Sequence, residues 1–325
     1  MHIDHLSLFT YKIPLTNHQQ RSGIFIKITD QQDRIGWGEI APLPIWSHET
    51  LDECFQQIVE KISLILSIQW TISSWMEELN HLQLFPSVSF GLESALLSIL
   101  SPQSKFQVST CALLMGSCKQ ILDQATLRYH EGYTHAKLKV SHLSFEEAAL
   151  IINQLKEKFR LRIDVNCAWK TEESLRFFSQ FPCNTFDYVE EPFKNPNDLI
   201  SFTHPLAIDE SFPNQITYEF LEKIPKLKTI VFKPTLQGGS HKCTFLFEWI
   251  KKRNLNLVLS SSYESDLGLA SIATMANRLK LIEPLGIGTF HFLTQKLCEF
   301  PLYFTNSNVI IPSSLTPKMD LLWKV

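Results

Sequence analysis

Short apolar runs recur at regular intervals beyond residue 105, and a helix-like segment follows each of them. The runs start about 20 to 27 residues apart, which is the length of one strand, one helix and two loops. Eight such units favour a closed barrel of alternating strands and helices. An open doubly wound sheet is the alternative, but it predicts a glycine-rich phosphate turn after the first strand, and Leu113–Cys118 is not one. The runs are Val108–Leu114, His135–Val140, Leu161–Val165, Phe186–Val189, Leu206–Ile208, Thr229–Phe232, Leu255–Leu259 and, less clearly, Leu281–Leu285.

The first hundred residues follow a different pattern. Apolar and polar residues alternate in Ser22–Asp30 and in Ile35–Ile40, and the turn-forming segment Gln31–Arg34 separates the two. This arrangement predicts an antiparallel hairpin. Helical patterns follow it, so we expect a small α+β unit before the barrel.

Capping signals mark several of the expected helices. Thr50–Glu53 has the spacing of a capping box and leads into an amphipathic run that extends to about Leu66. A second helix is expected at roughly Ser89–Leu100. In the barrel, Ser144–Glu147 has the same capping spacing and opens an apolar-periodic segment, Ala148–Phe159.

The charge balance, the cysteines and the hydropathy limit the class of protein. The 30 basic and 33 acidic residues give a net charge of −3, which argues against a nucleic-acid binder. The seven cysteines include no C-x-x-C pair, so we interpret them as reduced thiols. No stretch is apolar enough to span a bilayer, and the N-terminus lacks the pattern of a secretory signal. We therefore expect a cytoplasmic protein that binds neither nucleic acid nor membrane.

Six consecutive predicted strands end in charged or hydroxyl side chains. In a barrel these ends converge at the carboxyl-terminal mouth, where active sites of this architecture lie. Alternation along a strand places residues two apart on the same face. We therefore expect an inward-facing charged set, which includes Lys137 and Lys139 on the second strand and Arg162, Asp164 and Asn166 on the third. The other strand ends carry Glu190 and Glu191, Asp209 and Glu210, Lys233, and Ser260–Ser262.

Each of these signals is weak when taken singly. A carboxylate at a strand end is more often a turn former or a helix cap, and Lys137-Leu-Lys139 is more often a solvated face. As a set, however, Asp164, Glu190 and Asp209 would repel one another unless a cation lay between them. Oxygen ligands favour Mg²⁺ or Mn²⁺ over Zn²⁺. Lysines on both sides of a metal-bound carboxylate would suit removal of the proton next to that carboxylate.

The ordered motifs resemble the enolase superfamily, in its muconate-lactonizing-enzyme-like branch, and within that branch the o-succinylbenzoate synthases. This resemblance implies a (β/α)₇β modified TIM barrel, of class α/β, with an N-terminal α+β capping domain. The implied divisions are 1–104 for the capping domain, 105–290 for the barrel and 291–325 for a segment that returns to the capping domain. The matching motifs are Gly36–Pro44, Pro86–Ala95, Lys137–Lys139, Asp164–Asn166, Glu190–Pro192, Ile208–Ser211, Phe232–Gly239, Ser260–Ser265 and Leu267–Leu269.

The same resemblance implies the roles of the central residues. Mg²⁺, with Mn²⁺ as an alternative, would be held by Asp164, Glu190 and Asp209. Lys139 would remove the α-proton and then act as the acid that helps the β-hydroxyl group leave. Lys233 would lie on the opposite side and stabilise the enediolate.

Two positions depart from what relatives carry. They are Cys167 and Gly288, and they put the substrate contacts in doubt more than the chemistry.

The resemblance also implies roles for residues near the catalytic lysines. Lys137, Arg162 and Asn166 would position Lys139 and Asp164. Residues that would close over or contact the substrate are Arg21 and Ser22, the loop Trp46–His48, and Ser261 and Ser262.

The implied reaction is dehydration of 2-succinyl-6-hydroxy-2,4-cyclohexadiene-1-carboxylate to 2-succinylbenzoate in menaquinone biosynthesis, with a small carboxylate as the substrate. One alternative is an N-succinylamino acid racemase or dipeptide epimerase on the same fold, which would use both lysines as bases. The other alternative is a catalytically inactive barrel that acts as a binding protein. That hypothesis predicts the loss of a metal ligand or a lysine, and none is lost.

Overall fold

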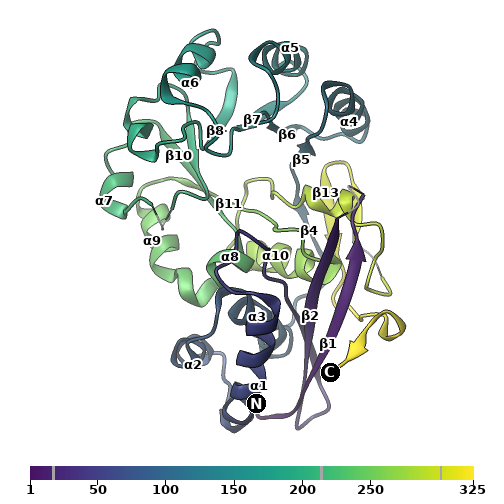
Figure 1. The fold of residues 1–325 in the computed structure, drawn as a ribbon. Helices are drawn as coiled ribbons and strands as arrows, with labels where there is room; N and C mark the ends of the chain where they lie inside the picture. The colour runs from purple at the N-terminus through teal and green to yellow at the C-terminus, as the bar shows by residue number, and fades with distance from the viewer. Residues whose placement is uncertain (17–18, 213–214, 301) are drawn as a thin grey trace.

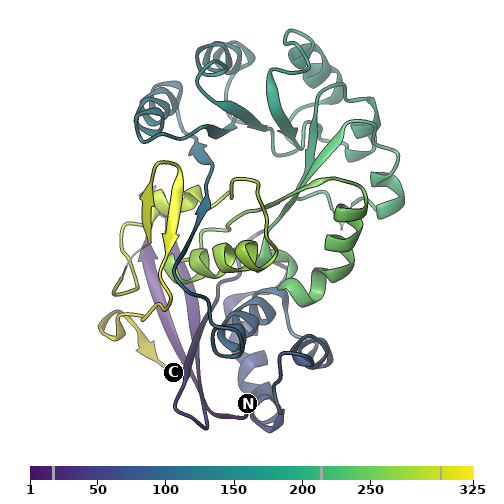
Figure 2. The ribbon, with the colours of Figure 1, turned by 180° about the vertical axis from the view of Figure 1, so that it is seen from behind.

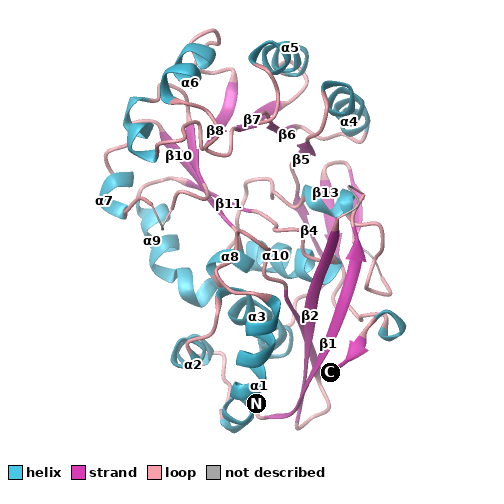
Figure 3. Ribbon diagram, in the orientation of Figure 1, coloured by secondary structure: helices cyan, strands magenta, loops and turns pink. Residues whose placement is uncertain are grey.

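The structure is a computed structural model of the 325-residue chain, and it describes every residue except 17–18, 213–214 and 301. Figure 1 shows a curved row of parallel strands with helices around it, and an antiparallel sheet with three helices below it. Figure 3 shows that the helices of the upper part lie outside the strands. Among the described residues, no helix is both long enough and apolar enough to cross a membrane.

The N-terminal part is a four-stranded antiparallel sheet with helices on one face. Its order is β14-β1-β2-β3. Apolar side chains such as Ile24, Ile26 and Ile28 face the helices and form a separate core with them. The bounds are β1 Ile3–Pro14, β2 Gln20–Asp30, β3 Ile35–Ile40 and β14 Trp323–Lys324 for the strands, and α1 Leu51–Ser67, α2 Trp75–Leu82 and α3 Pro86–Leu100 for the helices.

The predicted hairpin is confirmed, because β2 and β3 pair antiparallel. The expectation omitted β1, which pairs with β2 along almost its whole length. The Gly-Trp-Gly segment of β3 has a packing role: a side chain at Gly36 or Gly38 would collide with the backbone of α3 at Ala95 or Gly91. The two glycines therefore allow α3 to lie directly against the sheet.

The barrel is built on seven parallel strands in the order β11-β10-β9-β8-β7-β6-β5. Leu285 and Gly286 close it: Leu285 bridges to Thr110 beside β5, and Gly286 bridges to Ser260 beside β11. The (β/α)₇β fold class is therefore confirmed. The bounds are β5 Ala112–Leu114, α4 Cys118–His130, β6 His135–Lys139, α5 Phe145–Leu155, β7 Arg160–Asp164, α6 Thr171–Phe178, β8 Phe186–Glu190, η1 Pro196–Ser201, β9 Leu206–Ile208, α7 Tyr218–Leu221, β10 Leu227–Phe232, α8 Pro234–Gln237, η2 Ser240–Cys243, α9 Thr244–Lys252, β11 Asn256–Leu259, α10 Asp266–Arg278 and η3 Gly288–Phe292.

Two expected strands differ from the structure. The run Val108–Leu114 is divided between two sheets, because β4 (Phe106–Ser109) pairs antiparallel with β13 and only β5 enters the barrel. The run Leu281–Leu285 forms no strand of its own, and the closing bridges come from its last residue and Gly286.

The expected helices are confirmed, with shifted ends. The α1 capping box of Thr50 with Glu53 and the α5 capping box of Ser144 with Glu147 are both present. Helix α3 begins at Pro86 and not at Ser89, because proline is tolerated at the first helical position, where the missing N–H has no helical partner. Helix α5 ends at Leu155, four residues before the expected end.

The C-terminal segment contacts both parts of the molecule. Strands β12 (Tyr303–Thr305) and β13 (Asn308–Ile311) form a hairpin that extends β4, and after η4 (Met319–Leu321) strand β14 pairs with β1. Figure 2 shows this yellow hairpin beside the purple strands β1 and β2. We keep the divisions 1–104, 105–290 and 291–325 as a proposal.

Candidate active site

A cavity of about 240 Å³ lies at the carboxyl-terminal ends of the barrel strands. Both predicted catalytic lysines, Lys139 at the end of β6 and Lys233 directly after β10, line it. Leu43 and Trp46 reach it from the loop between β3 and α1, and the Lys233 ammonium lies 6.0 Å from the centroid of a Trp46 ring. The N-terminal part of the chain therefore supplies one wall of a cavity that the barrel builds.

Lysines and carboxylates from neighbouring strands are interleaved at this mouth. Lys137 Nζ lies 2.6 Å from Glu190 Oε1 and 3.0 Å from Asp164 Oδ2. Lys139 Nζ lies 3.2 Å from the same Asp164 oxygen and donates a 2.9 Å hydrogen bond to Asn166 Oδ1. Parallel pairing places these residues level with one another, since Lys139 pairs with Asp164 and Asp164 with Glu190.

Burial and neighbouring charges shift the pKa values of this group in different directions. Burial alone would raise the pKa of Asp164, but Lys137 and Lys139 lower it to about 2. Burial raises the pKa of Glu190 well above its usual value, despite Lys137. For Lys137, the nearby carboxylates outweigh burial and raise the pKa well above its usual value. Glu190 is therefore the carboxylate whose charge most requires a further cation.

An acidic cluster beside these residues is suited to a divalent cation. Carboxylate oxygens of Glu190, Asp209 and Glu210 all lie within 4.8 Å of one another. Oε2 of Glu190 and Oε2 of Glu210 are buried without a hydrogen-bond partner. Unpartnered buried carboxylate oxygens are costly unless a cation compensates them, and oxygen ligands suit hard divalent ions. The residues present therefore fit such an ion.

The composition of this cluster differs from the predicted ligand set in one member. Asp164, which we expected as a ligand, lies between Lys137 and Lys139, whereas Glu210 joins Glu190 and Asp209. The sequence contained a signal for Glu210, since it follows Asp209 at the end of the fifth predicted strand. Asn166 connects the two groups by donating to Glu210 Oε1 at 3.2 Å.

Glu191 has a positioning role that the sequence did not reveal. Its Oε1 accepts hydrogen bonds from the backbone N–H groups of Asp209, at 2.8 Å, and Ser211, at 3.0 Å, and also from the Ser211 hydroxyl. It thereby fixes the backbone that carries Asp209. The Cys167 thiol donates to the other oxygen of Glu191, and burial raises its pKa. Cys167 is therefore a thiol of low reactivity and not a nucleophile.

Arg162 does not occupy the position that we expected. It is buried and lines the cavity, but its guanidinium donates to Asp187, Glu283 and the carbonyl of Pro284. None of these acceptors belongs to Lys139 or Asp164, so Arg162 forms no hydrogen bond with either residue in the structure. Lys137 and Asn166 do contact them.

Arg21 and Ser22, which we expected to contact the substrate, lie outside the lining of the cavity, and their contact with the substrate stays a prediction. Arg21 is only 4% exposed, and its guanidinium donates to the backbone carbonyls of Ala41, Pro42 and Tyr263. The arginine therefore holds the loop that carries Trp46 close to the barrel. Neither Arg21 nor Ser22 lines the cavity. Sequence position alone could not distinguish this backbone contact from a substrate contact.

Ser261 and Ser262 do line the cavity, as expected. Ser262 Oγ is buried without a partner, which leaves it available to a bound molecule. Ser261 Oγ already contacts the carbonyl of Gly286 and the hydroxyl of Thr289. At Gly288, the position that departs from the relatives, an added Cβ would lie 2.7 Å from Leu113 Cβ, so a larger residue would require a local shift.

Comparisons with known proteins agree with this geometry. The family model described as "MenC, N-terminal domain" matches residues 4–99, and "Enolase C-terminal domain-like" matches residues 120–314. The chain is 31% identical to o-succinylbenzoate synthase of Vibrio cholerae, with 98% of each protein covered. It is 29% identical to that of Pasteurella multocida, with 95% of this chain and 97% of that protein covered.

Solved structures show the same fold. A muconate lactonizing enzyme gives a TM-score of 0.82 at 19% identity, and the L-Ala-D/L-Glu epimerase of Bacillus subtilis gives 0.80 at 17% identity. In both comparisons 98% of each chain is covered. The chain belongs to the o-succinylbenzoate synthase family of the enolase superfamily.

Proposed function

We propose that the protein removes water from 2-succinyl-6-hydroxy-2,4-cyclohexadiene-1-carboxylate to give 2-succinylbenzoate, a hydro-lyase step of menaquinone biosynthesis. The observation that carries the proposal is the meeting of Lys139 and Lys233, from separate strands, in one cavity beside a buried acidic cluster. Family membership over nearly the whole chain supports the same activity.

Proton transfer falls to Lys139. Its Nζ accepts the proton from the carbon next to the substrate carboxylate, and the electron pair of that C–H bond moves toward the carboxylate. As the ring becomes aromatic, the bond to the neighbouring hydroxyl breaks, and the same Nζ returns the proton so that water leaves. Asn166 Oδ1, 2.9 Å from Nζ, orients the amine for both transfers.

Charge stabilisation is shared by the remaining groups. Asp164, Glu190 and Asp209, at the ends of three neighbouring strands, with Glu210 beside them, would hold a divalent cation, which we propose to be Mg²⁺ or Mn²⁺. When bound, the cation supplies positive charge that favours the doubly negative form of the substrate. Lys233, whose pKa is raised by Asp209 despite burial, keeps its positive charge near the same place. Trp46 covers this side of the cavity.

The cytoplasm is the proposed location. All seven cysteines are free, and four of them, Cys54, Cys111, Cys243 and Cys298, are buried. Burial raises the pKa of Cys54 to about 12 and of Cys111 to about 11, so these thiols are unreactive. Thiols kept in this form suit a reducing compartment.

The deciding experiment is an absorbance assay of the purified protein with the cyclohexadiene substrate, in Mg²⁺ and in EDTA. A parallel assay measures racemisation of N-succinyl amino acids. We expect metal-dependent dehydration. Racemisation without dehydration would show that the proposed substrate is wrong and that the assigned site residues still hold. Inactivity in both assays would contradict the proposal.

A further inference from the structure

The floor of the active-site cavity is formed by side chains that lie deeper in the barrel than the lysines and carboxylates of the mouth. Tyr188, Val231 and Val258 line this floor, each two residues before the polar side chain at the end of its strand. Because residues two apart point to the same side of a strand, the three also face the barrel interior. Two residues of strand add about 6.6 Å of depth. A molecule that fills the cavity therefore meets Tyr188 below the catalytic lysines.

Tyr188 is a buried tyrosine whose hydroxyl group forms no hydrogen bond with the residues that the structure describes. Tyr188 is only 1% exposed, yet it lines the cavity. The hydroxyl groups of Ser260 and Ser261, which line the same cavity, both donate to the carbonyl of Gly286. A buried hydroxyl group is nearly always hydrogen-bonded, because losing water without gaining a new partner costs free energy. The phenol group of Tyr188 is therefore an unused donor at the floor of the cavity.

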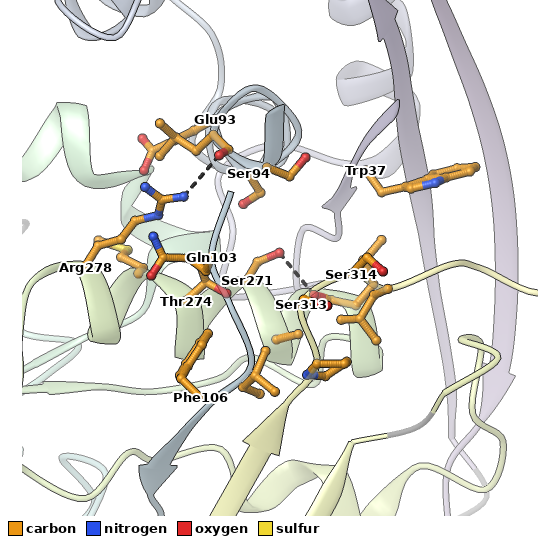
Figure 4. Close-up of a pocket in the computed structure, with 18 of the residues that line it drawn as sticks. Trp37, Glu93, Ser94, Gln103, Phe106, Ser271, Thr274, Arg278, Ser313 and Ser314 are labelled. Atoms are coloured by element: carbon orange, nitrogen blue, oxygen red, sulfur yellow. Dashed lines mark hydrogen bonds between the residues drawn. The ribbon is translucent and has the colours of Figure 1, made fainter. Parts of the chain in front are cut away.

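A second cavity shows the more usual arrangement. It has a volume of about 180 Å³ and lies between the N-terminal part and the barrel, and Figure 4 shows Arg278 and Ser271 in its wall. Arg278 donates to the side chain and the carbonyl of Ser101, and Ser271 donates to the carbonyl of Leu267 at 3.1 Å. These donors are satisfied within the protein, whereas the hydroxyl group of Tyr188 is not.

Arg162 fixes the ring of Tyr188. The two residues pair on the neighbouring strands β7 and β8, and the central guanidinium carbon of Arg162 lies 5.0 Å from the centroid of the Tyr188 ring. A cation over an aromatic face is attracted to it, and Arg162 is itself anchored by Asp187 and Glu283. A ligand that accepts a hydrogen bond from Tyr188 therefore meets a side chain that is already ordered, which lowers the entropic cost of binding.

The charges near the floor favour an uncharged acceptor. Lys137 Nζ lies 2.6 Å from Glu190 Oε1, and an Nη atom of Arg162 lies 2.8 Å from Glu283 Oε2. Both cations are compensated by carboxylates, so a further carboxylate would gain little there. A ketone oxygen, in contrast, requires only a neutral donor such as a phenol hydroxyl group.

We propose that Tyr188 is a specificity-determining residue, whose hydroxyl group donates a hydrogen bond to the ketone oxygen of the substrate's succinyl group. This inference rests on the proposed function. In the proposed substrate, the ketone is attached to the ring carbon next to the one that bears the carboxylate. With the carboxylate at the acidic cluster and the α-proton at Lys139, the succinyl group extends from the ring toward the floor.

The hydrogen bond should contribute to binding and not to the chemical step. When the α-proton leaves, negative charge spreads over the carboxylate and alternate ring carbons, and the ketone is attached to none of these. The hydrogen bond is therefore equally strong before and during proton removal, so it lowers KM without changing kcat. Tyr188→Phe, which removes one oxygen and keeps the ring against Arg162, should raise KM roughly tenfold and leave kcat within twofold.

The test is a pair of ligands that differ only at the ketone. Isothermal titration calorimetry of the full chain in Mg²⁺ compares 2-succinylbenzoate with 2-(3-carboxypropyl)benzoate, in which a methylene group replaces the ketone. We expect the preference for 2-succinylbenzoate, given by the ratio of the two dissociation constants, to fall roughly tenfold from the parent to Tyr188→Phe. A merely structural effect of the substitution would weaken both ligands equally and leave this ratio unchanged.

Tyr218→Phe is the matched control, because it removes the same oxygen from a tyrosine on α7 that does not line the cavity. Its KM and its ligand preference should equal those of the parent. Far-UV circular dichroism verifies that both variants fold.

Two results would overturn the role of Tyr188 alone, provided that the parent dehydrates the cyclohexadiene substrate. They are an unchanged ligand preference in folded Tyr188→Phe, and a lower kcat at unchanged KM in that variant. A parent protein that neither dehydrates the substrate nor binds 2-succinylbenzoate would contradict the proposed function and, with it, this inference.

Discussion

At the scale of single residues, the mouth of the barrel is a set of buried charges that compensate one another. Lys137 lies between Asp164 and Glu190, and Lys233 pairs with Asp209. Removing one member of a buried charged set leaves its partner uncompensated, which costs more than the pair itself contributes. Substitutions here must therefore be judged by stability as well as by activity.

Lys139→Ala should lower kcat by roughly 10³-fold, because the proposed general base and acid is lost. Asp209→Asn should abolish turnover too, through the cation site. Lys228→Ala is the matched control, because it makes the same Lys-to-Ala change on a barrel strand. Lys228 lies on β10, pairs with Asp187 and does not line the cavity. The absorbance assay and far-UV circular dichroism measure activity and folding. Near-parental activity of folded Lys139→Ala would contradict its assigned role.

Asp30 should make stability depend on pH. Burial would raise its pKa, but hydrogen bonds from Arg34 and Gln32 outweigh burial and lower the pKa below 3.8. The contribution of Asp30 to the free energy of unfolding is therefore complete above the pKa that the carboxyl has in the unfolded chain. It is lost as the pH falls through the lower pKa of the folded protein. Asp30→Asn should cost about 1 kcal/mol near neutral pH. Urea unfolding should show the difference from the parent shrinking as the pH falls below the usual pKa of an aspartate, and a pH-independent difference would refute this cause.

At the scale of elements, the loop between β11 and α10 is held by buried carboxylates from both parts of the chain. Glu39 of β3 accepts from the backbone N–H groups of Ser265 and Gly268, so it stabilises the first turn of α10. Glu264 accepts from the backbone N–H of Ser262. The position of the unpartnered Ser262 hydroxyl in the active-site cavity therefore depends on a residue of the N-terminal sheet.

Glu39→Gln should raise KM several-fold and lower the free energy of unfolding by about 2 kcal/mol, since a buried charge-assisted acceptor is weakened. Steady-state kinetics with the cyclohexadiene substrate, combined with urea unfolding, measures both effects. Glu60→Gln, an exposed position on α1, makes the same chemical change and should alter neither quantity. A loss of stability with unchanged KM would show that Glu39 acts on folding alone.

Ser144→Ala should destabilise the protein by about 1 kcal/mol, because it removes the N-cap of α5. Ser144→Asp should retain most of the stability, since aspartate accepts the same hydrogen bond from the Glu147 backbone. Urea unfolding compares the three proteins. An equal loss of stability in both variants would show that Ser144 does not stabilise the protein through the helix cap.

Local sequence patterns could not predict every strand correctly, and the run predicted as the first barrel strand shows why. The run Val108–Leu114 has the apolar character of one strand, but its two halves satisfy different partners, β13 for the first and β6 for the second. A period-two pattern reports burial on a face and not which strand provides the hydrogen bonds. The two capping boxes were predictable because all their partners lie within four residues.

At the scale of the whole molecule, the active site lies at a junction of the two parts. Trp46 is carried by a loop that Arg21 ties to the backbone of Tyr263 after β11. The C-terminal strand β14 returns to β1 and so joins the end of the chain to its beginning. A cation bound at the acidic cluster would therefore stabilise an assembly to which both parts contribute.

Removal of the cation tests whether a cation bound at the acidic cluster stabilises the folded molecule. Mg²⁺ should raise the melting temperature of EDTA-treated protein, since an ion that binds only the folded state adds stability, about 2.7 kcal/mol at a hundred times Kd. Activity should return in parallel. Asp209→Asn should lose most of this thermal shift. A shift of equal size in Asp209→Asn, measured by differential scanning fluorimetry, would place the cation elsewhere.

The fold class, the hairpin, the capped helices and the strand ends that carry Lys139, Glu190, Asp209 and Lys233 could be predicted from the sequence, because periodicity, capping and motif order are read along the chain. The place of Glu210 in the acidic cluster became visible only in the folded chain. The same is true of the contacts through which Arg21 holds a loop. Side-chain partners depend on strand register and on contacts between residues far apart in the chain, which no local pattern records.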